Sequence, residues 1–190
     1  RVNRVAADTP YRMTVPITTR VSAPAPVDSN RGTEPAAVVI PVMTIGRQVG
    51  EAYLTHHRVT RSEARIKTLE MLATVRIRDP ERVYSAYPHE VSGGMGQRIM
   101  LAMMLIPDPD LMIADEPTSA LDVTVQLQLL SILDDLVTER RMGLIFISHD
   151  LGVVSEISDY VAIMHQGQLV EQGEMKKVFS NPQHPYTKGL

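Results

Sequence analysis

The chain has 190 residues, which suits about one to one-and-a-half domains and is enough to bury a core. Hydrophobic residues make up 44% and charged residues 22%, so a wholly disordered chain is excluded. The net charge of -3 argues against a protein that coats nucleic acid phosphates. With no cysteine, the chain has no disulfide, thiolate metal site or cysteine nucleophile. Apolar runs fall short of the roughly 18 residues that span a bilayer, so we expect a soluble or peripheral protein.

The first 41 residues differ in composition from the rest of the chain. They hold six of the thirteen prolines and show no helical or alternating apolar pattern. We therefore predict an irregular, proline-rich leader over residues 1–41, with ordered structure starting near Val42. Further on, Thr60 and Glu63 have the spacing of a capping box and predict an amphipathic helix. Its apolar stripe is expected to contain Ile66, Leu69, Leu72 and Ala73.

The middle of the chain has the pattern of a buried helix followed by a crossover unit. Residues 99–106 are apolar on every side and predict a helix entirely inside the protein. The short apolar runs 111–114 and 144–148 predict buried strands, and the amphipathic stretch 123–140 predicts a helix between them. Strand, helix and strand in this order predict a parallel sheet of the α/β class.

The last part of the chain predicts a hairpin and a short helix. Residues 160–164 and 168–171 are joined at Gly167 and have the pattern of two antiparallel strands. Residues 174–179 predict the final short helix.

Polar side chains follow both predicted parallel strands at the point where each strand ends. Asp115 and Glu116 come directly after the first strand, and His149 follows the second. Ligands of open α/β sheets bind beyond this edge, so the three side chains are expected to converge there. Nucleotide hydrolysis needs one carboxylate for Mg²⁺ and a neighbour that orients water. Taken alone, the acidic pair also fits a helix cap, and His149 fits a structural contact with Asp150.

A glycine-rich segment precedes the buried helix. In Ser92 to Gln97 the glycines let backbone amides approach an anion, and the helix start adds unpaired amides. The segment therefore predicts a phosphate site, although an ordinary flexible turn before a helix would have a similar sequence.

Together these motifs resemble the nucleotide-binding subunits of ATP-binding cassette (ABC) transporters. Residues 92–97 resemble the signature motif, 111–116 the Walker B strand, 119–122 the D-loop and His149 the switch histidine. Related ATPases of DNA repair and chromosome organisation share such motifs. They usually insert coiled coils or zinc-binding segments, and neither heptads nor cysteines occur here.

Three further segments resemble the dipeptide and oligopeptide importer branch of the family. Nickel and glutathione importers have much of the same sequence in these segments. These are residues 87–90, 122–126 and 184–187. The resemblance implies ATP hydrolysis that powers peptide import, with ATP and Mg²⁺ bound. It also implies a second ABC ATPase subunit, transmembrane permease subunits, an indirectly engaged substrate-binding protein and no nucleic acid partner. The expected location is peripheral, on the cytoplasmic face of the inner membrane.

The resemblance also implies a role for each site residue. Asp115 would organise Mg²⁺, and the catalytic residues Glu116 and His149 would polarise water and contact the γ-phosphate. The cofactor-binding set would act across a dimer of subunits, on ATP held by the facing one. Ser92, Gly93 and Gly94 would hold the γ-phosphate of that ATP, and Asp122 would link the two sites. Gln97 completes the cofactor-binding set.

The resemblance implies a partial P-loop-type ABC ATPase domain, with a parallel core sheet and a helical subdomain but without the upstream strands of the family. The helical subdomain would cover residues 42–106 and end in the signature motif and its helix. The remaining ATPase core would cover 107–173, and 174–190 would be a C-terminal extension. The 190 residues contain no Gly-x-x-x-x-Gly-Lys phosphate loop, and the Q-loop glutamine of the family is also missing.

These omissions lead to two expectations, the first of which has an alternative. The chain would be an N-terminally truncated or mis-started subunit, inactive alone, whose motifs could complete a site supplied by an intact partner. The alternative is a non-catalytic partner or regulatory fragment of an intact ABC ATPase. Without the upstream strands, the parallel sheet would have an uncovered edge and exposed apolar faces.

Overall fold

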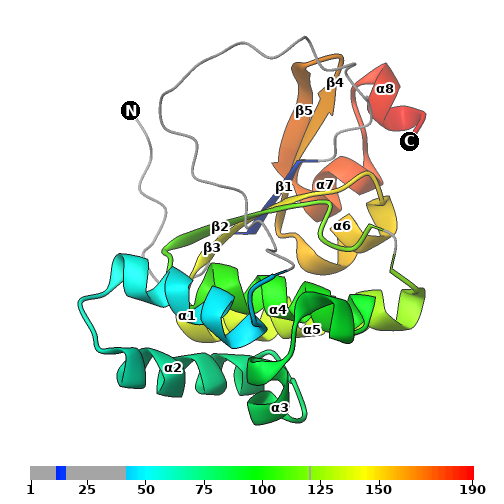
Figure 1. The fold of residues 1–190 in the computed structure, drawn as a ribbon. Coiled ribbons are helices and arrows are strands. Elements are labelled where there is room, and N and C mark those ends of the chain that lie inside the picture. The colour runs from blue at the N-terminus through cyan, green and yellow to red at the C-terminus, as the bar shows by residue number, and fades with distance from the viewer. Residues whose placement is uncertain (1–11, 16–41, 120) are drawn as a thin grey trace, which may run out of the picture. The chain divides into compact units, whose positions relative to one another are not determined.

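The computed structural model describes residues 12–15, 42–119 and 121–190. They fall into two compact units, one helical and one built on a sheet (Figure 1). The described part of the helical unit is 42–109 with 121–132, and that of the sheet unit is 12–15 with 110–119 and 133–190. Residues 174–190 belong to the sheet unit, and the first half of helix α5 (Val123–Arg140) belongs to the helical unit.

Four α-helices and one short 3₁₀ helix precede the first half of α5 in the helical unit. They are α1 (Ile45–His56), α2 (Arg61–Thr74), α3 (Pro80–Ser85), η1 (Pro88–Glu90) and α4 (Gly93–Leu105). Helix α1 contacts α2, α3 and α4. Buried apolar residues such as Val49, Leu72 and Ala102, one from each of α1, α2 and α4, form the core of this unit.

Helix α2 begins with the predicted capping box. The Thr60 hydroxyl accepts a hydrogen bond from the Glu63 amide at 3.3 Å, and the Thr60 amide donates to the Glu63 carboxylate at 2.7 Å. The predicted apolar face is right only in part: Leu72 is buried and Leu69 half-buried, but Ile66 is 57% exposed and Ala73 is also exposed. The buried positions are Ala64, Thr68, Met71 and Leu72. Small residues on this face let α1 approach closely, since a Cβ at Gly50 would lie 3.2 Å from the Thr68 hydroxyl oxygen.

Helix α4 is less enclosed than its sequence predicts. Ile99, Leu101, Ala102 and Leu105 are buried, whereas the intervening methionines are only half-buried. Flexible methionines tolerate such partly covered positions well. The expectation of a helix entirely inside the protein therefore holds for one face only.

The sheet unit confirms the predicted α/β class. Its five strands have the order β2-β3-β1-β4-β5, with β4 and β5 antiparallel and the other neighbours parallel. The strands are β1 (Arg12–Val15), β2 (Leu111–Asp115), β3 (Gly143–Ile147), β4 (Tyr160–His165) and β5 (Gln168–Glu174). Strands β2 and β3 are neighbours joined through α5, and β4 and β5 form the predicted hairpin.

Strand β1 corrects the prediction that residues 1–41 are irregular throughout. It lies between β3 and β4 and pairs in parallel with both, with Val15 opposite Ile147. Most of the predicted leader lies outside the described residues. Sequence periodicity could not identify β1, because a four-residue strand among prolines gains its stability from pairing with residues far along the chain.

Three short helices complete the sheet unit: α6 (Leu151–Ile157), α7 (Met175–Ser180) and α8 (Pro185–Lys188). A cluster of buried side chains joins α6, β4 and α7; its members are Val154, Val161, Ile163 and Val178. The Glu171 carboxylate accepts hydrogen bonds from the amides of Gln183 and His184 at 2.8 and 2.9 Å. These contacts tie the start of α8 to β5.

Strand β2 forms one edge of the sheet, as expected. Its exposed and buried positions alternate, and Leu111 and Ile113 on one face are 52% and 54% exposed. Exposed apolar side chains on an edge strand favour association between chains. No helix in the described part of the chain is long and apolar enough to cross a membrane.

Candidate functional site

Glu116 and His149 meet where β2 and β3 end. The Nδ1 atom of His149 lies 2.7 Å from Oε1 of Glu116, and the side chains of His149 and Glu116 are 65% and 33% exposed. The Glu116 amide donates to the Ile147 carbonyl at 2.9 Å, which extends the β2–β3 pairing by one step. The parallel register therefore places the acid and the imidazole side by side, as the positions of the strand ends predict.

The backbone of Glu116 is held in an uncommon conformation. Its φ is +49°, in the left-handed region that residues with a Cβ rarely adopt. Strain of this kind persists where the surrounding contacts fix it, and it is frequent at functional sites. Here the bond to Ile147 on one side and the Ser119 amide bonded to the Glu116 carbonyl at 3.1 Å on the other hold the turn. The turn directs the carboxylate toward His149.

Asp115 is the last residue of β2, directly before Glu116. Its side chain is exposed, and no hydrogen bond or ion pair engages its carboxylate within residues 12–15, 42–119 and 121–190. Neither Asp115 nor Glu116 caps a helix, so the alternative interpretation of this acidic pair is wrong. The acidic residue that caps a helix here is Asp150. Its carboxylate accepts hydrogen bonds from the amides of Gly152 and Val153 at the start of α6.

Hydrogen bonding to Glu116 raises the pKa of His149 above its ordinary value, and the negative charge of Glu116 acts in the same direction. The protonated imidazole and the carboxylate form a charged pair at pH values below the raised pKa of His149 at which the carboxylate is ionised. This contact weakens as the pH rises through the raised pKa of His149, because the imidazole then loses its charge.

We expect the substitution Glu116→Gln to lower the pKa of His149 toward its ordinary value, since the carboxylate that favours the imidazolium is removed. An NMR titration of the His149 imidazole resonances measures the shift. The matched control is Glu139→Gln, which removes an exposed carboxylate on α5 and should leave the His149 titration unchanged. If both variants titrate like the wild type, the Glu116–His149 contact does not form in solution.

The glycine-rich segment opens α4 and lines a separate hollow of about 660 Å³ in the helical unit. Ser92, Gly93, Gly94 and Asp122 all border this hollow, so the helical unit brings four of the five predicted cofactor-binding residues together. Gln97 does not border it. The Gln97 side of α4 lines a smaller, largely apolar hollow of about 200 Å³ instead, with Met100 and Met103.

The first turn of α4 provides backbone donors. Ser92 caps the helix, its hydroxyl accepting from the Met95 amide at 3.4 Å. Within the described residues, no acceptor takes the amides of Gly93 and Gly94, as expected for the first turn of a helix. A Cβ at Gly93 would meet nothing within 4 Å, whereas one at Gly94 would lie 2.8 Å from Val125. Gly93 is therefore open for the close approach of an anion.

Arginines border the same hollow, and the sequence motifs do not include them. Arg76, Arg78, Arg82 and Arg98 contribute to its lining. Three of them occur within seven residues of sequence, a charge cluster that could have indicated them. Arg98 donates to the Gln128 side chain at 2.6 Å, which links α4 to α5. The positive charge favours an anionic occupant for the hollow.

Asp122 has a structural contact in addition to any role between subunits. Its carboxylate accepts from the Val125 amide at 3.0 Å at the start of α5. The described residues hold no cluster of three or more His, Asp or Glu side chains that could bind a metal ion by itself. A lone strand-end carboxylate such as Asp115 suits Mg²⁺, which takes one or two protein carboxylates and completes its shell with phosphate oxygens and water.

Strand-end acid and histidine side chains on a parallel sheet are typical of α/β nucleotide-binding proteins, and so is a glycine-rich helix start. Residues 28–119 match the ABC transporter family. The chain is 52% identical over 157 residues to the probable peptide ABC transporter ATP-binding protein y4tR of Sinorhizobium fredii (83% of this chain, 47% of the relative). It is 48% identical to the glutathione import ATP-binding protein GsiA of Escherichia coli (83% and 25%). The chain therefore belongs to the ABC transporter family of ATP-binding proteins.

Solved structures agree with this assignment. The dimeric structure of MJ0796, a bacterial ABC transporter cassette, matches with a TM-score of 0.65 and 25% identity, covering 73% of this chain and 60% of that chain. A post-hydrolysis state of the same cassette, bound to ADP and Pi, gives the same TM-score and identity. The chain spans less than half the length of the curated relatives named above.

Proposed function

We propose that this chain acts as an ATP-binding and ATP-hydrolysing subunit that powers ABC-type import of di- or oligopeptides. The observation that carries the proposal is the 2.7 Å contact between Glu116 and His149 beside Asp115 at the carboxyl ends of neighbouring parallel strands. The names of the relatives, a peptide transporter and a glutathione importer among them, support small peptides as cargo.

At the face that carries these strand ends, Asp115 would hold Mg²⁺, which supplies charge neutralisation for the phosphates when bound. Glu116 would orient the water that attacks the γ-phosphate and accept its proton. His149 lies within hydrogen-bonding distance of Glu116, so it can fix the carboxylate and contact the γ-phosphate. Phosphoryl transfer is catalysed mainly by such positioning and by electrostatic stabilisation.

A second ABC ATPase subunit would face this chain, and its ATP would reach the signature segment. The open amides of Gly93 and Gly94, with Ser92, would hold the γ-phosphate of that ATP. Asp122 would lie where the two subunits meet. Transmembrane permease subunits and, indirectly, a substrate-binding protein complete the proposed assembly, at the cytoplasmic face of the inner membrane.

The 190 residues contain no Gly-x-x-x-x-Gly-Lys loop, which normally cradles the β- and γ-phosphates. We therefore propose that these 190 residues alone do not turn over ATP and that they complete a site on an intact subunit. The same observation favours a second candidate, a non-catalytic regulatory partner of an intact ABC ATPase.

Phosphate release by an intact peptide-importer ATPase subunit, with and without this chain, tests the proposal. We expect background turnover for the chain alone and several-fold faster turnover for the mixture. A decrease in turnover would favour the regulatory candidate. Micromolar ATP binding by the isolated chain would contradict the claim that it depends on an intact partner, and unchanged turnover in the mixture would contradict both candidates.

A further inference from the structure

The hollow at the signature segment is larger than a single phosphate group needs. Its volume of about 660 Å³ is roughly twenty times the 30 Å³ that one water molecule takes in the liquid. The amides of Gly93 and Gly94, to which we assign one phosphate, border only part of it. Most of the hollow therefore has no assigned occupant.

A second part of the lining is an arginine cluster, formed by Arg78, Arg82 and Arg98. Arg78 lies between α2 and α3 and is exposed. Its side chain forms no ion pair and no hydrogen bond within residues 42–119 and 121–190. The positive charge of Arg78 is therefore available to a ligand in the hollow.

Arg98 is held in place without being neutralised. Its guanidinium donates to the Arg76 carbonyl at 3.1 Å and to Oε1 of Gln128 at 2.6 Å. Both acceptors are uncharged, and no carboxylate pairs with Arg98 in the part of the chain that the structure describes. A cation whose position is already set loses little conformational entropy when an anion binds. The contact with Arg76 also places Arg98 beside the segment that carries Arg78.

The acidic residues of the hollow do not cancel this charge. Four arginines and two aspartates border it. Asp79 caps α3 and lies 3.8 Å from the Arg82 guanidinium, but both side chains are exposed and such a pair is weak. Asp122 accepts a hydrogen bond from the Val125 amide at the start of α5. Helices α4 and α5 both begin at the hollow, so the positive ends of two helix dipoles add to the arginine charge.

We propose that the arginine cluster is a second anion subsite and that the ligand of the whole hollow is a chain of linked phosphates. One phosphate lies at the amides of Gly93 and Gly94, and the phosphates linked to it pair with Arg78 and Arg98. Guanidinium groups match phosphate oxygens with two parallel hydrogen bonds. Because the phosphates are linked, engaging the first subsite raises the effective concentration at the second.

Two sources have this chemistry: the nucleotide of a facing subunit and free inorganic polyphosphate. The inference deepens the proposed function and rests on it for the amide subsite, to which it adds the ligand class and the arginines that select it. A single phosphate reaches only one subsite. The hollow is therefore expected to discriminate between phosphate chains and orthophosphate.

NMR titrations of the full 190-residue chain with inorganic tripolyphosphate and with orthophosphate, at equal ionic strength, test the subsite. We expect tripolyphosphate to bind about tenfold tighter or more, and both anions to shift the Gly93 amide resonance. Arg78→Gln removes a guanidinium that has no internal contact, so the fold should be unaffected, which circular dichroism checks. This variant should weaken tripolyphosphate binding by about fivefold or more and leave orthophosphate binding unchanged.

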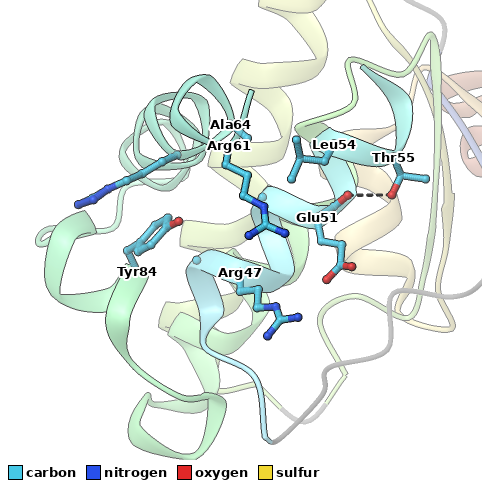
Figure 2. Close-up of a pocket in the computed structure, with 10 residues that line it drawn as sticks. Arg47, Glu51, Leu54, Thr55, Arg61, Ala64 and Tyr84 are labelled. Carbon is cyan, nitrogen blue, oxygen red and sulfur yellow. Dashed lines mark hydrogen bonds between the residues drawn. The ribbon is translucent and has the colours of Figure 1, made fainter. Parts of the chain in front are cut away.

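The matched control is Arg61→Gln, which removes an exposed arginine from a different groove of the same unit. Figure 2 shows Arg61 extending from α2 over this groove, which has a volume of about 540 Å³ and is bordered by α1, α2 and Tyr84 of α3. Arg61 does not border the signature hollow. The control should therefore leave the affinity for tripolyphosphate unchanged.

Phosphate release by an intact peptide-importer subunit mixed with this chain identifies the source of the phosphate chain. If the source is the facing nucleotide, Arg78→Gln raises the ATP concentration that gives half-maximal turnover. An unchanged ATP dependence, with tripolyphosphate binding that still requires Arg78, assigns the subsite to free polyphosphate. The inference is overturned if tripolyphosphate binds no tighter than orthophosphate, or if Arg78→Gln and Arg61→Gln have equal affinities. A mixture without acceleration would contradict the proposed function alone, because the titrations contain no facing subunit.

Discussion

Replacing Gly93 by Asp is expected to abolish the acceleration that this chain gives to a facing ATP-binding subunit. The Gly93 and Gly94 amides at the start of α4 have no acceptor in the described residues, and a Cβ at Gly93 points into open space. The carboxylate would therefore occupy the approach of the γ-phosphate and repel it. Loss of one preorganised donor to such charge costs about 10² to 10³ in rate, and a repelling charge adds to that loss.

The substitution is informative because it spares the fold. An acidic residue in the first turn of a helix is favoured by the helix dipole, so α4 should form normally in the Gly93→Asp variant. Gly96→Asp is the matched control: a Cβ at Gly96 also meets nothing within 4 Å, but Gly96, unlike Gly93, does not border the 660 Å³ hollow with the arginines. Phosphate release should fall for the first variant only. Unchanged phosphate release with the Gly93→Asp variant would show that the signature segment does not meet ATP.

Phe146→Ala is expected to destabilise the sheet unit by about 3 to 5 kcal/mol. Phe146 is 1% exposed in β3, and its backbone partners are Thr14 in β1 and Ala114 in β2. Ala114 on the neighbouring strand β2 is too small to fill the space of a lost ring, so a cavity remains. Since His149 follows Phe146 by three residues, the contact between His149 and Glu116 should loosen as well.

Urea denaturation followed by circular dichroism measures this loss of stability. The control Ile145→Ala truncates the adjacent residue of β3, which is only half-buried and points to the other face of the sheet. Its cost should be clearly smaller, because less apolar surface is removed from contact. A loss below about 1 kcal/mol for Phe146→Ala would mean that β3 is not packed as described.

The parts that the sequence predicts best are those that local pattern determines. Apolar runs of four or five residues, bounded by polar or proline residues, locate β2 and β3, and the amphipathic stretch between them locates α5. The parallel crossover then requires that residues after the two strands share an edge. That geometric step is enough to predict the meeting of Glu116 and His149.

The parts that the sequence misses depend on contacts between distant residues. The buried face of α2 is set by close packing against Gly50 of α1, which hydrophobicity alone does not reveal. The direction of Gln97 depends on how α4 is rotated against its neighbours, so the motif that contains Gln97 could not place it correctly relative to the signature hollow. Strand β1 escapes prediction because it is defined by its two neighbours in the sheet.

The proposed ATP sites are shared between two subunits. In each site, one subunit provides the strand-end residues and the facing subunit provides the signature residues. The most direct measurement is photolabelling with an ATP analogue that carries its reactive group on the γ-phosphate. The analogue is first bound to an intact subunit, this chain is then added, and the labelled peptides are identified by mass spectrometry. We predict label on the segment from Ser92 to Arg98 of this chain, and loss of that label in the Gly93→Asp variant. Label elsewhere on the chain, or none, would contradict the shared-site proposal.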